Sequence, residues 1–388
     1  MKRERSGAQS RALPLLLLSL TLSLNQHKRK INSMILQTFR ALARRIAALT
    51  VVAAVAAAST GCDDSFLFDY EGDCDPYFKA RFRFDMNLHY ADAFPNEVNA
   101  VTLYLIDPAT GNIVWQRSES GDRLKEDGYL MDIDVAPGDY QVMAWCGEGV
   151  GQHFTVPVDA THHTHLTCTL GRNAETGGAT VRDDIKRLYH GAIRNDDGSY
   201  ATVSLPDEEG VHIIDVPLVK DTNDVNILLQ HLSGQKVDAA DYTFTITDNN
   251  GYLNWDNSIL DDEPITYFAH HVSQGTAGVP AAAPAVRADP ITTLSACLAE
   301  HTVSRLIKGQ DTRVKVYHKD KAEPIIDIPL IDYALMMKTT HYSHMTDQEY
   351  LDRQDKYDIT FFLDERDHWM YATINVLSWS VVVQNADL

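Results

Sequence analysis

The sequence predicts an all-β protein, built as two tandem antiparallel β-sandwich domains that follow a lipoprotein signal peptide. Three observations carry this prediction. Apolar and polar residues alternate with a period of two in many short segments, turn residues separate these segments at regular spacing, and 388 residues is long for one domain. Short strands with this spacing favour a sandwich over a parallel α/β sheet.

The first 61 residues have the layout of a secretion signal. Two apolar runs, residues 13–24 and 46–58, are each shorter than the roughly 20 residues that span a bilayer. The second run follows Met34 and a basic cluster, and after it come Ser, Thr and Gly directly before Cys62. Small residues before a cysteine are typical of bacterial lipoprotein signals. We therefore expect Cys62 to become the acylated N-terminus and Met34 to be the true initiator.

Charge is placed very unevenly along the chain. Residues 1–61 hold ten of the 34 basic side chains and one of the 54 acidic ones, which leaves 24 basic and 53 acidic residues after the signal. A net charge of −29 on that part repels nucleic acid and anionic lipid headgroups, so neither is an expected partner of the folded body. We interpret residues 62–76, acidic and without apolar periodicity, as a tether.

Residues 77–205 form the first predicted domain. In residues 78–84 apolar side chains alternate with basic ones, as in a strand with one buried face. Pro137 and Gly138 supply the backbone angles of a turn between two further strands. The strands expected here are 78–84, 98–106, a segment through Trp115, 129–135, 140–145, 154–158 and 165–170.

A polar stretch at 171–184 and the segment 185–195 lead to the second predicted domain, residues 206–388. Residues 330–338 and 347–354 are predicted as short helices, and the Ala- and Pro-rich segment 275–290 as an exposed loop. The alternation changes phase between Val376 and Leu377, which predicts a β-bulge. The strands expected in this domain are 211–218, 225–232, 242–247, 313–317, 325–328, 357–363 and 371–383.

Four cysteines follow Cys62. An exported chain meets an oxidising environment, and four cysteines allow three disulfide connectivities. We expect one bridge among Cys74, Cys146 and Cys168, with the pairing left open, and we expect Cys297 to be free and buried. The chain has no CxxC pair, which argues against a zinc ribbon or a thioredoxin-like site.

Sixteen histidines raise the question of a metal site. The densest run is His162, His163 and His165, of which only the last two would share a face of a strand, whereas zinc needs three or four ligands. We interpret these histidines as exposed. The chain has no HExxH, GxSxG or Walker motif, and Asp132 and Asp134 fall on the solvent face of a strand. No metal, cofactor or catalytic site is expected, so the protein is not predicted to be an enzyme.

Short phrases, in order along the chain, resemble a known family. They are YTFTITDNNG at 242–251, WD at 255–256, SRL at 304–306, IPLIDY at 328–333, DQEYLDR at 347–353 and YDITFFL at 357–363. With APGDY at 136–140 and the acylation pattern at Cys62, residues 62–388 resemble the FimB/Mfa-type fimbrial anchor family, which is related to the fimbrillins. The extended N-terminus, Cys146 and the loop at 275–290 depart from the family pattern.

The resemblance implies a lipoprotein of the cell outer membrane, exposed at the surface, with two transthyretin-like β-sandwich domains. It implies a role in holding the base of fimbriae to the cell and in fimbrial assembly and length control, with fimbrial structural or accessory subunits as partners. Fimbriae of this family grow by strand donation between subunits. Leu377, Trp379, Val381 and Val383 are therefore either a core strand of the second sandwich or an exchangeable segment that contacts the next subunit.

The sequence is compatible with two other functions. A glycan-binding or otherwise adhesive surface lipoprotein is the alternative, and a cluster of exposed Trp and Tyr side chains would favour it. The five tryptophans fall within or beside predicted strands, where a sandwich core also takes large aromatic residues. An enzyme would need titratable groups that converge in one pocket.

Overall fold

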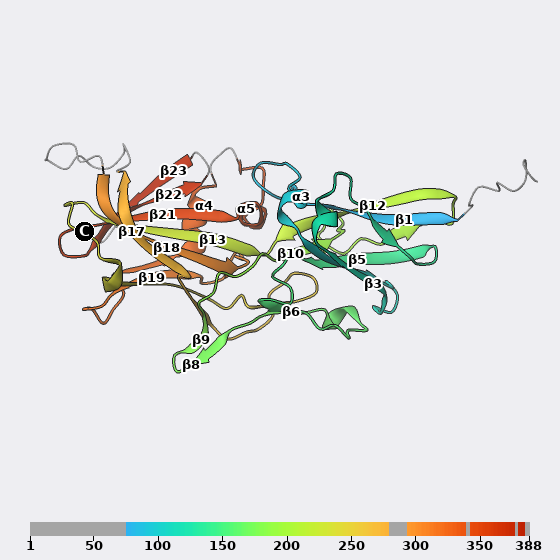
Figure 1. The fold of residues 1–388 in the computed structure, drawn as a ribbon, viewed down its shortest axis with the longest axis horizontal. Coiled ribbons are helices and arrows are strands. Elements are labelled where there is room, and N and C mark those ends of the chain that lie inside the picture. The colour runs from blue at the N-terminus through green and yellow to red at the C-terminus, as the bar shows by residue number, and fades with distance from the viewer. Residues whose placement is uncertain (1–74, 279–292, 339–341, 377–378, 385–388) are drawn as a thin grey trace, which may run out of the picture. The chain divides into compact units, whose positions relative to one another are not determined.

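The computed structural model describes residues 75–278, 293–338, 342–376 and 379–384, which belong to one compact unit, Asp75–Leu388. Strands dominate this part of the chain and form four sheets (Figure 1). This confirms the prediction of an all-β protein.

The first sheet has the strand order β3-β2-β5-β10-β12-β1-β4, with β11 paired to β5. Its strands are β1 (Pro76–Arg83), β2 (Ala100–Ile106), β3 (Ile113–Ser120), β4 (Met131–Ile133), β5 (Gly138–Cys146), β10 (Tyr189–Ala192), β11 (Val203–Leu205) and β12 (Gly210–Lys220). The short helices α3 (Phe94–Glu97) and η1 (Asp122–Lys125) lie between strands in the sequence. In β1 the apolar residues Phe78, Ala80 and Phe82 are buried, so the predicted alternation is confirmed.

Two six-stranded sheets are formed mainly by the second half of the chain. One has the order β17-β18-β13-β21-β22-β23, seen side by side in Figure 1, and the other β20-β19-β14-β16-β9-β8. The strands of the first are β13 (Thr222–His231), β17 (His271–Gly278), β18 (Thr293–Ser304), β21 (Lys356–Leu363), β22 (Trp369–Val376) and β23 (Trp379–Gln384). Those of the second are β8 (Asn173–Glu175), β9 (Gly178–Val181), β14 (Tyr242–Asp248), β16 (Ile265–Phe268), β19 (Arg313–His318) and β20 (Ile326–Pro329).

The remaining elements are small. A three-stranded sheet has the order β15-β7-β6, with β6 (Phe154–Thr155), β7 (Cys168–Leu170) and β15 (Tyr252–Leu253). The helical segments are η2 (His163–His165), η3 (Ala239–Asp241), α4 (Leu330–Met336) and α5 (Asp347–Arg353). The last two confirm the predicted helices. The Thr346 side chain caps α5 by accepting a hydrogen bond of 3.0 Å from the backbone N–H of Glu349, a favourable start for a helix.

Two clusters of buried apolar side chains stabilise the sheets. One face of β2 and β5 gives Leu103 and Ala144 to the first cluster, and the opposite face gives Tyr104 and Trp145 to the second. Trp145 is 1% exposed, and its Nε1 donates a hydrogen bond of 3.0 Å to the carbonyl oxygen of Leu166. Complete burial of a large apolar side chain contributes about 1.5–3 kcal/mol, so apolar contacts hold both faces of this strand pair.

The prediction of antiparallel sheets needs correction at three places. The pairs β1–β12, β13–β21 and β9–β16 are parallel, whereas the other pairs of strands described here are antiparallel. Parallel neighbours need long connections. Pro76 lies opposite Gly210, and Asp224 lies opposite Lys356. Such distant partners cannot be found from a local pattern.

The predicted strand 371–383 with a bulge is instead a hairpin. β22 ends at Val376 and β23 begins at Trp379, and these two residues lie opposite each other in an antiparallel pair. A tight turn and a bulge both shift the alternation of side chains, so the phase change alone could not distinguish them.

The polar stretch at 171–184 is more ordered than the sequence suggested, because it contains β8 and β9 at the end of a sheet. The chain leaves the first sheet and enters the next at Asp221, the residue between β12 and β13. The division of the chain at Pro206 into two domains stays a prediction.

Candidate functional site

A buried ion cluster lies where the chain passes from β12 to β13. Lys220 is 4% exposed, and its Nζ lies 2.6 Å from Oδ2 of Asp355 and 3.5 Å from Oε2 of Glu97. The Tyr189 hydroxyl donates a hydrogen bond of 2.9 Å to the same oxygen of Glu97, and burial raises the pKa of Tyr189 well above its usual value. Because Glu97 comes from α3 and Asp355 from the chain just before β21, one lysine links segments far apart in sequence.

Asp221, the next residue, is fully buried. Nδ2 of Asn257 donates a hydrogen bond of 2.9 Å to its Oδ1, Nε of Arg305 lies 3.7 Å from that oxygen, and its Oδ2 has no hydrogen-bond donor within the described residues. Burial raises the pKa of Asp221 to about 7, although Arg305 and Asn257 act in the opposite direction. Loss of hydration therefore outweighs the attraction of the guanidinium.

Arg305 joins Asp221 to α5. Its Nε and Nη2 donate to the two carboxylate oxygens of Asp352 at 2.9 and 2.8 Å, and its Nη1 donates to the carbonyl oxygen of Asn257 at 2.7 Å. The Arg305 side chain is 12% exposed and that of Asp352 is 11% exposed. Two parallel bonds of this kind fix the relative orientation of both groups.

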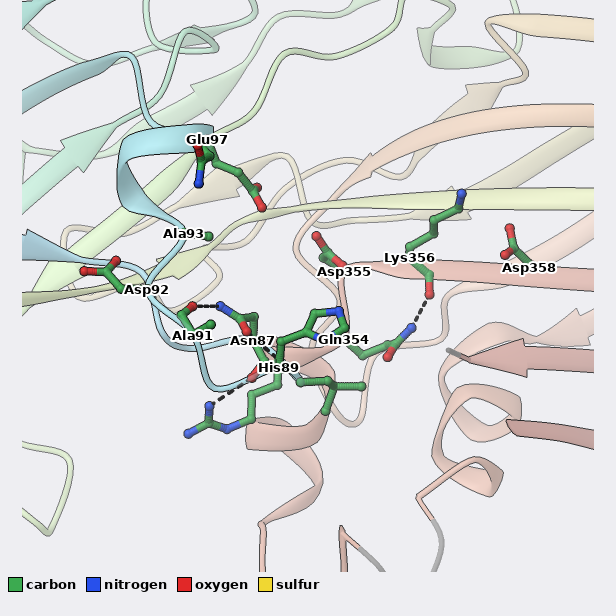
Figure 2. A pocket seen from close by; sticks show the side chains of 13 residues that line it. Asn87, His89, Ala91, Asp92, Ala93, Glu97, Gln354, Asp355, Lys356 and Asp358 are labelled. Atoms are coloured by element: carbon green, nitrogen blue, oxygen red, sulfur yellow. Dashed lines mark hydrogen bonds between the residues drawn. The ribbon is translucent and has the colours of Figure 1, made fainter. Parts of the chain in front are cut away.

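A groove of about 550 Å³ lies beside the ion cluster. One wall is the loop between β1 and α3, and the other is the end of α5 with the start of β21 (Figure 2). Most of its lining side chains are polar or charged. They are Asn87, Leu88, His89, Ala91, Asp92, Ala93, Asn96, Glu97, Arg353, Gln354, Asp355, Lys356 and Asp358.

The loop that forms the first wall is held by side chains. Nδ2 of Asn87 donates to two carbonyl oxygens of the loop at 2.8 and 3.0 Å, and Oδ1 of Asp92 accepts from two backbone N–H groups at 2.9 and 3.1 Å. From the opposite wall, Nη1 of Arg353 donates to two further loop carbonyls at 3.1 and 3.3 Å. The shape of the groove is therefore fixed from both sides.

The residues that the sequence singled out are not brought together here. Cys62, Cys74 and Leu377 lie outside the described residues. Trp379, Val381 and Val383 lie on β23, the last strand of its sheet.

The three described cysteines, Cys146, Cys168 and Cys297, are all free and buried. The last agrees with its prediction. Cys146 and Cys168 are free, so the expected bridge is not formed at either residue. Their places in different core clusters separate the two thiols from each other.

His165 is exposed as expected, but His162 and His163 are half-buried and contact other rings. His162 and His163 stack with ring centroids 4.4 Å apart, and His163 packs edge-on against Trp255 at 4.1 Å. Within the described ranges, no group of three or more His, Cys, Asp or Glu side chains has an arrangement that could hold a metal ion. None of the helices in those ranges is long and apolar enough to cross a membrane.

Sequence reasoning missed Lys220, Asp221 and the groove. A signal was present, because the polar run 220–224 lies between two apolar strands and contains no Gly or Pro. The phrase SRL at 304–306, which contains Arg305, supported the family resemblance but gave no indication of an ion pair. What no pattern could supply was the partners, since Lys220 binds Asp355 and Arg305 binds Asp352 through tertiary contact.

Three of the solved structures that resemble this chain illustrate its relationships. A candidate adhesin from Bacteroides thetaiotaomicron is 29% identical, with a TM-score of 0.66, and the match covers 81% of this chain and 100% of that one. A candidate polysaccharide-binding protein from the same species is 26% identical, with the same TM-score and coverage. The fimbrial anchor protein Mfa2 from Porphyromonas gingivalis shares the fold, with a TM-score of 0.56 at 16% identity over 80% of this chain and 100% of that one. The similarity to these structures identifies the class of the protein, a β-rich surface protein of the fimbrial or adhesin type.

Residues 70–385 match the family of fimbrillin-A associated anchor proteins Mfa1 and Mfa2, and the chain belongs to this family. This confirms the resemblance found in the sequence. No curated protein matches the chain significantly. Membership gives the protein a fimbrial or adhesin-type role in association with the cell envelope.

Proposed function

We propose that this protein is a lipoprotein that anchors fimbriae to the outer membrane, is exposed at the cell surface, and takes part in fimbrial assembly and length control. The observation that carries the proposal is the family match over residues 70–385. The sequence before it has the pattern expected of a lipoprotein signal, with Cys62 as the acylated residue. One acyl chain gives marginal membrane binding, so stable attachment needs the multiple acylation that a lipoprotein cysteine receives. The partner is a fimbrial structural or accessory subunit.

Replacing Cys62 by alanine in the cell tests this proposal. We expect the variant protein to leave the membrane fraction and fimbriae to appear in the medium, because the tether then lacks its lipid. Cys74→Ala is the matched control, since it removes a cysteine twelve residues further on and should leave both in place. A Cys62→Ala protein that still sediments with outer membranes in high salt would contradict the lipid anchor. Release of the protein with fimbriae still firmly attached would contradict anchoring.

We further propose that β23, which carries Trp379, Val381 and Val383, contacts the fimbrial subunit. The support is its place at the end of the strand order, because an edge strand offers backbone hydrogen-bonding groups to another chain. The alternative is that β23 serves only to complete its own sheet. In that case we expect no contact between β23 and a fimbrial subunit.

A photo-crosslinking residue at position 381 distinguishes these roles. We expect irradiation of intact cells to link this position to a fimbrial subunit. The same residue in place of Val272, which is 40% exposed on the opposite edge strand β17, should give no such product. Equal amounts of crosslinked product at both positions, or no product at position 381, would contradict the proposed contact. β23 would then act only as a strand of its own sheet.

A further inference from the structure

Asp221 and Asn257 each have one buried oxygen that finds no hydrogen-bond partner in the described part of the chain. These atoms are Oδ2 of Asp221 and Oδ1 of Asn257, and the two residues are 0% and 5% exposed. The other two polar atoms of the same groups already join them, because Nδ2 of Asn257 donates to Oδ1 of Asp221 at 2.9 Å. Buried polar atoms are almost always hydrogen-bonded, so two unpaired oxygens on one bonded pair of residues need an explanation.

A single proton on Asp221 satisfies both oxygens. An ionised carboxylate only accepts hydrogen bonds, whereas a carboxylic acid has an O–H group that donates. Carboxyl and amide groups share a planar shape, so an O–H on Oδ2 of Asp221 can donate to Oδ1 of Asn257 and close a ring of two hydrogen bonds. Asn257 is held in place for this pairing. Its φ of 65° is one that asparagine tolerates better than most residues, and its N–H donates to the carbonyl oxygen of Asn254 at 3.0 Å.

Arg305, the nearest cation, donates to other acceptors. Its Nε and Nη2 donate to the carboxylate of Asp352, and its Nη1 donates to the carbonyl oxygen of Asn257. The distance of 3.7 Å between Nε and Oδ1 of Asp221 is too long for a hydrogen bond. Burial raises the pKa of Asp221 to about 7, more than Arg305 and Asn257 lower it, and the charge of Asp352 acts in the same direction as burial. The hydrogen bonds and the cost of burial therefore both favour the acid form.

The other ionisable side chains around Asp221 keep one charge state near neutral pH. Burial raises the pKa of Cys146 on β5 and of Cys168 on β7, and Asp221 adds to the effect on both thiols. Burial lowers the pKa of His190 on β10 to about 3. Lys220, the preceding residue, is paired within the ion cluster. The thiols and the imidazole therefore stay neutral between pH 5 and pH 8, and Asp221 is the group that can titrate there.

Ionisation of Asp221 places two buried carboxylates beside one guanidinium. Arg305 then has to divide its donors between Asp221 and Asp352, and Asp352 belongs to α5. Nη1 of Arg353, the next residue of this helix, donates to the carbonyl oxygen of Asp85 at 3.1 Å. A weaker bond between Arg305 and Asp352 therefore loosens α5 and, through Arg353, the loop that forms one wall of the groove.

We infer that Asp221 and Asn257 form a proton-dependent latch on α5. In its acid form Asp221 pairs with Asn257 and leaves Arg305 to hold Asp352. In its ionised form Asp221 draws Arg305 away from Asp352, and the attachment of α5 weakens. The inference does not rest on the anchoring role, because it concerns the folded protein alone.

Infrared spectroscopy of the full-length protein in detergent at pH 6 tests for the proton. A protonated carboxyl group absorbs apart from ionised carboxylates, and we expect the natural protein to show an acid band that Asp221→Asn lacks. The variant should fold, because an asparagine N–H can donate to Oδ1 of Asn257 in place of the acid O–H. Identical spectra in this region would overturn the inference, because Asp221 would then be ionised at pH 6.

Hydrogen exchange measured by mass spectrometry tests the latch. After correction for the intrinsic effect of pH, we expect the amides of residues 347–353 to exchange about fivefold faster at pH 8.5 than at pH 6 in the natural protein. Asp221→Asn should show no such increase. Asp248→Asn is the matched control, since it removes a buried carboxyl group that binds Thr312 instead of Arg305, and it should keep the increase. The same exchange of these amides in the natural protein and in Asp221→Asn at pH 8.5 would overturn the latch.

Discussion

Replacing Arg305 by leucine is expected to lower the free energy of unfolding by about 3–5 kcal/mol, because it leaves buried carboxylates without their cation. Asp352 loses two hydrogen bonds from Nε and Nη2, and the fully buried Asp221 loses the nearest positive charge. Denaturant unfolding followed by tryptophan fluorescence measures the change.

Arg313→Leu is the matched control for this substitution. Arg313 pairs with Asp327 at 2.6 Å, but the two side chains are 29% and 37% exposed, so water screens the pair. Its loss is expected to cost less than about 1 kcal/mol. Equal destabilisation by the Arg305 and Arg313 substitutions would show that the buried network around Arg305 contributes no more to stability than an exposed ion pair.

Replacing Asp221 by asparagine is expected to change the pH dependence of stability. The pKa of Asp221 is about 7 in the folded protein, against about 3.9 in an unfolded chain. Between these values the folded protein keeps a proton that the unfolded chain releases. This group's contribution to stability is therefore full below about pH 4 and is lost as the pH rises to 7.

Asparagine does not ionise, and it keeps the oxygen that accepts from Asn257. The variant should therefore be more stable than the natural protein at pH 8, by an amount of the order of 3 kcal/mol, and the difference should shrink towards pH 4. Burial lowers the pKa of His190 to about 3 and that of His301 to about 4, so these residues change stability in the opposite direction. They are present in both proteins, and comparing the two cancels their effect.

Denaturant unfolding at pH 5 and pH 8 for both proteins measures this difference. A difference of the same size at the two pH values would contradict the raised pKa of Asp221. It would indicate that Arg305 keeps the carboxylate ionised throughout, so that the attraction between the two charges exceeds the cost of burying them.

Local patterns in the sequence determined many of the strands and the helices α4 and α5. They did not predict β10, β16, β17 or β18, and the loop expected at 275–290 begins within β17. Phe78, Ala80 and Phe82 are spaced by two, and this spacing alone places them on one face of β1. The helix α5 begins where Thr346 and Glu349 stand at the spacing of a cap and first turn. Both depend on interactions between residues close in sequence, and a single sequence reports such interactions directly.

Only the tertiary structure decided where distant segments meet. The parallel pairing of β1 with β12 joins Pro76 to Gly210, and the ion pair of Lys220 with Asp355 joins segments that no periodicity relates. The groove depends on the same kind of contact, because Arg353 holds a loop that precedes it by more than half the chain. Alternation reports which face of a strand is buried, but it carries no information about the strand's neighbour. For that physical reason the sequence by itself determined the all-β class and the family, whereas the folded chain decided the hairpin, the buried charges and the groove beside the ion cluster.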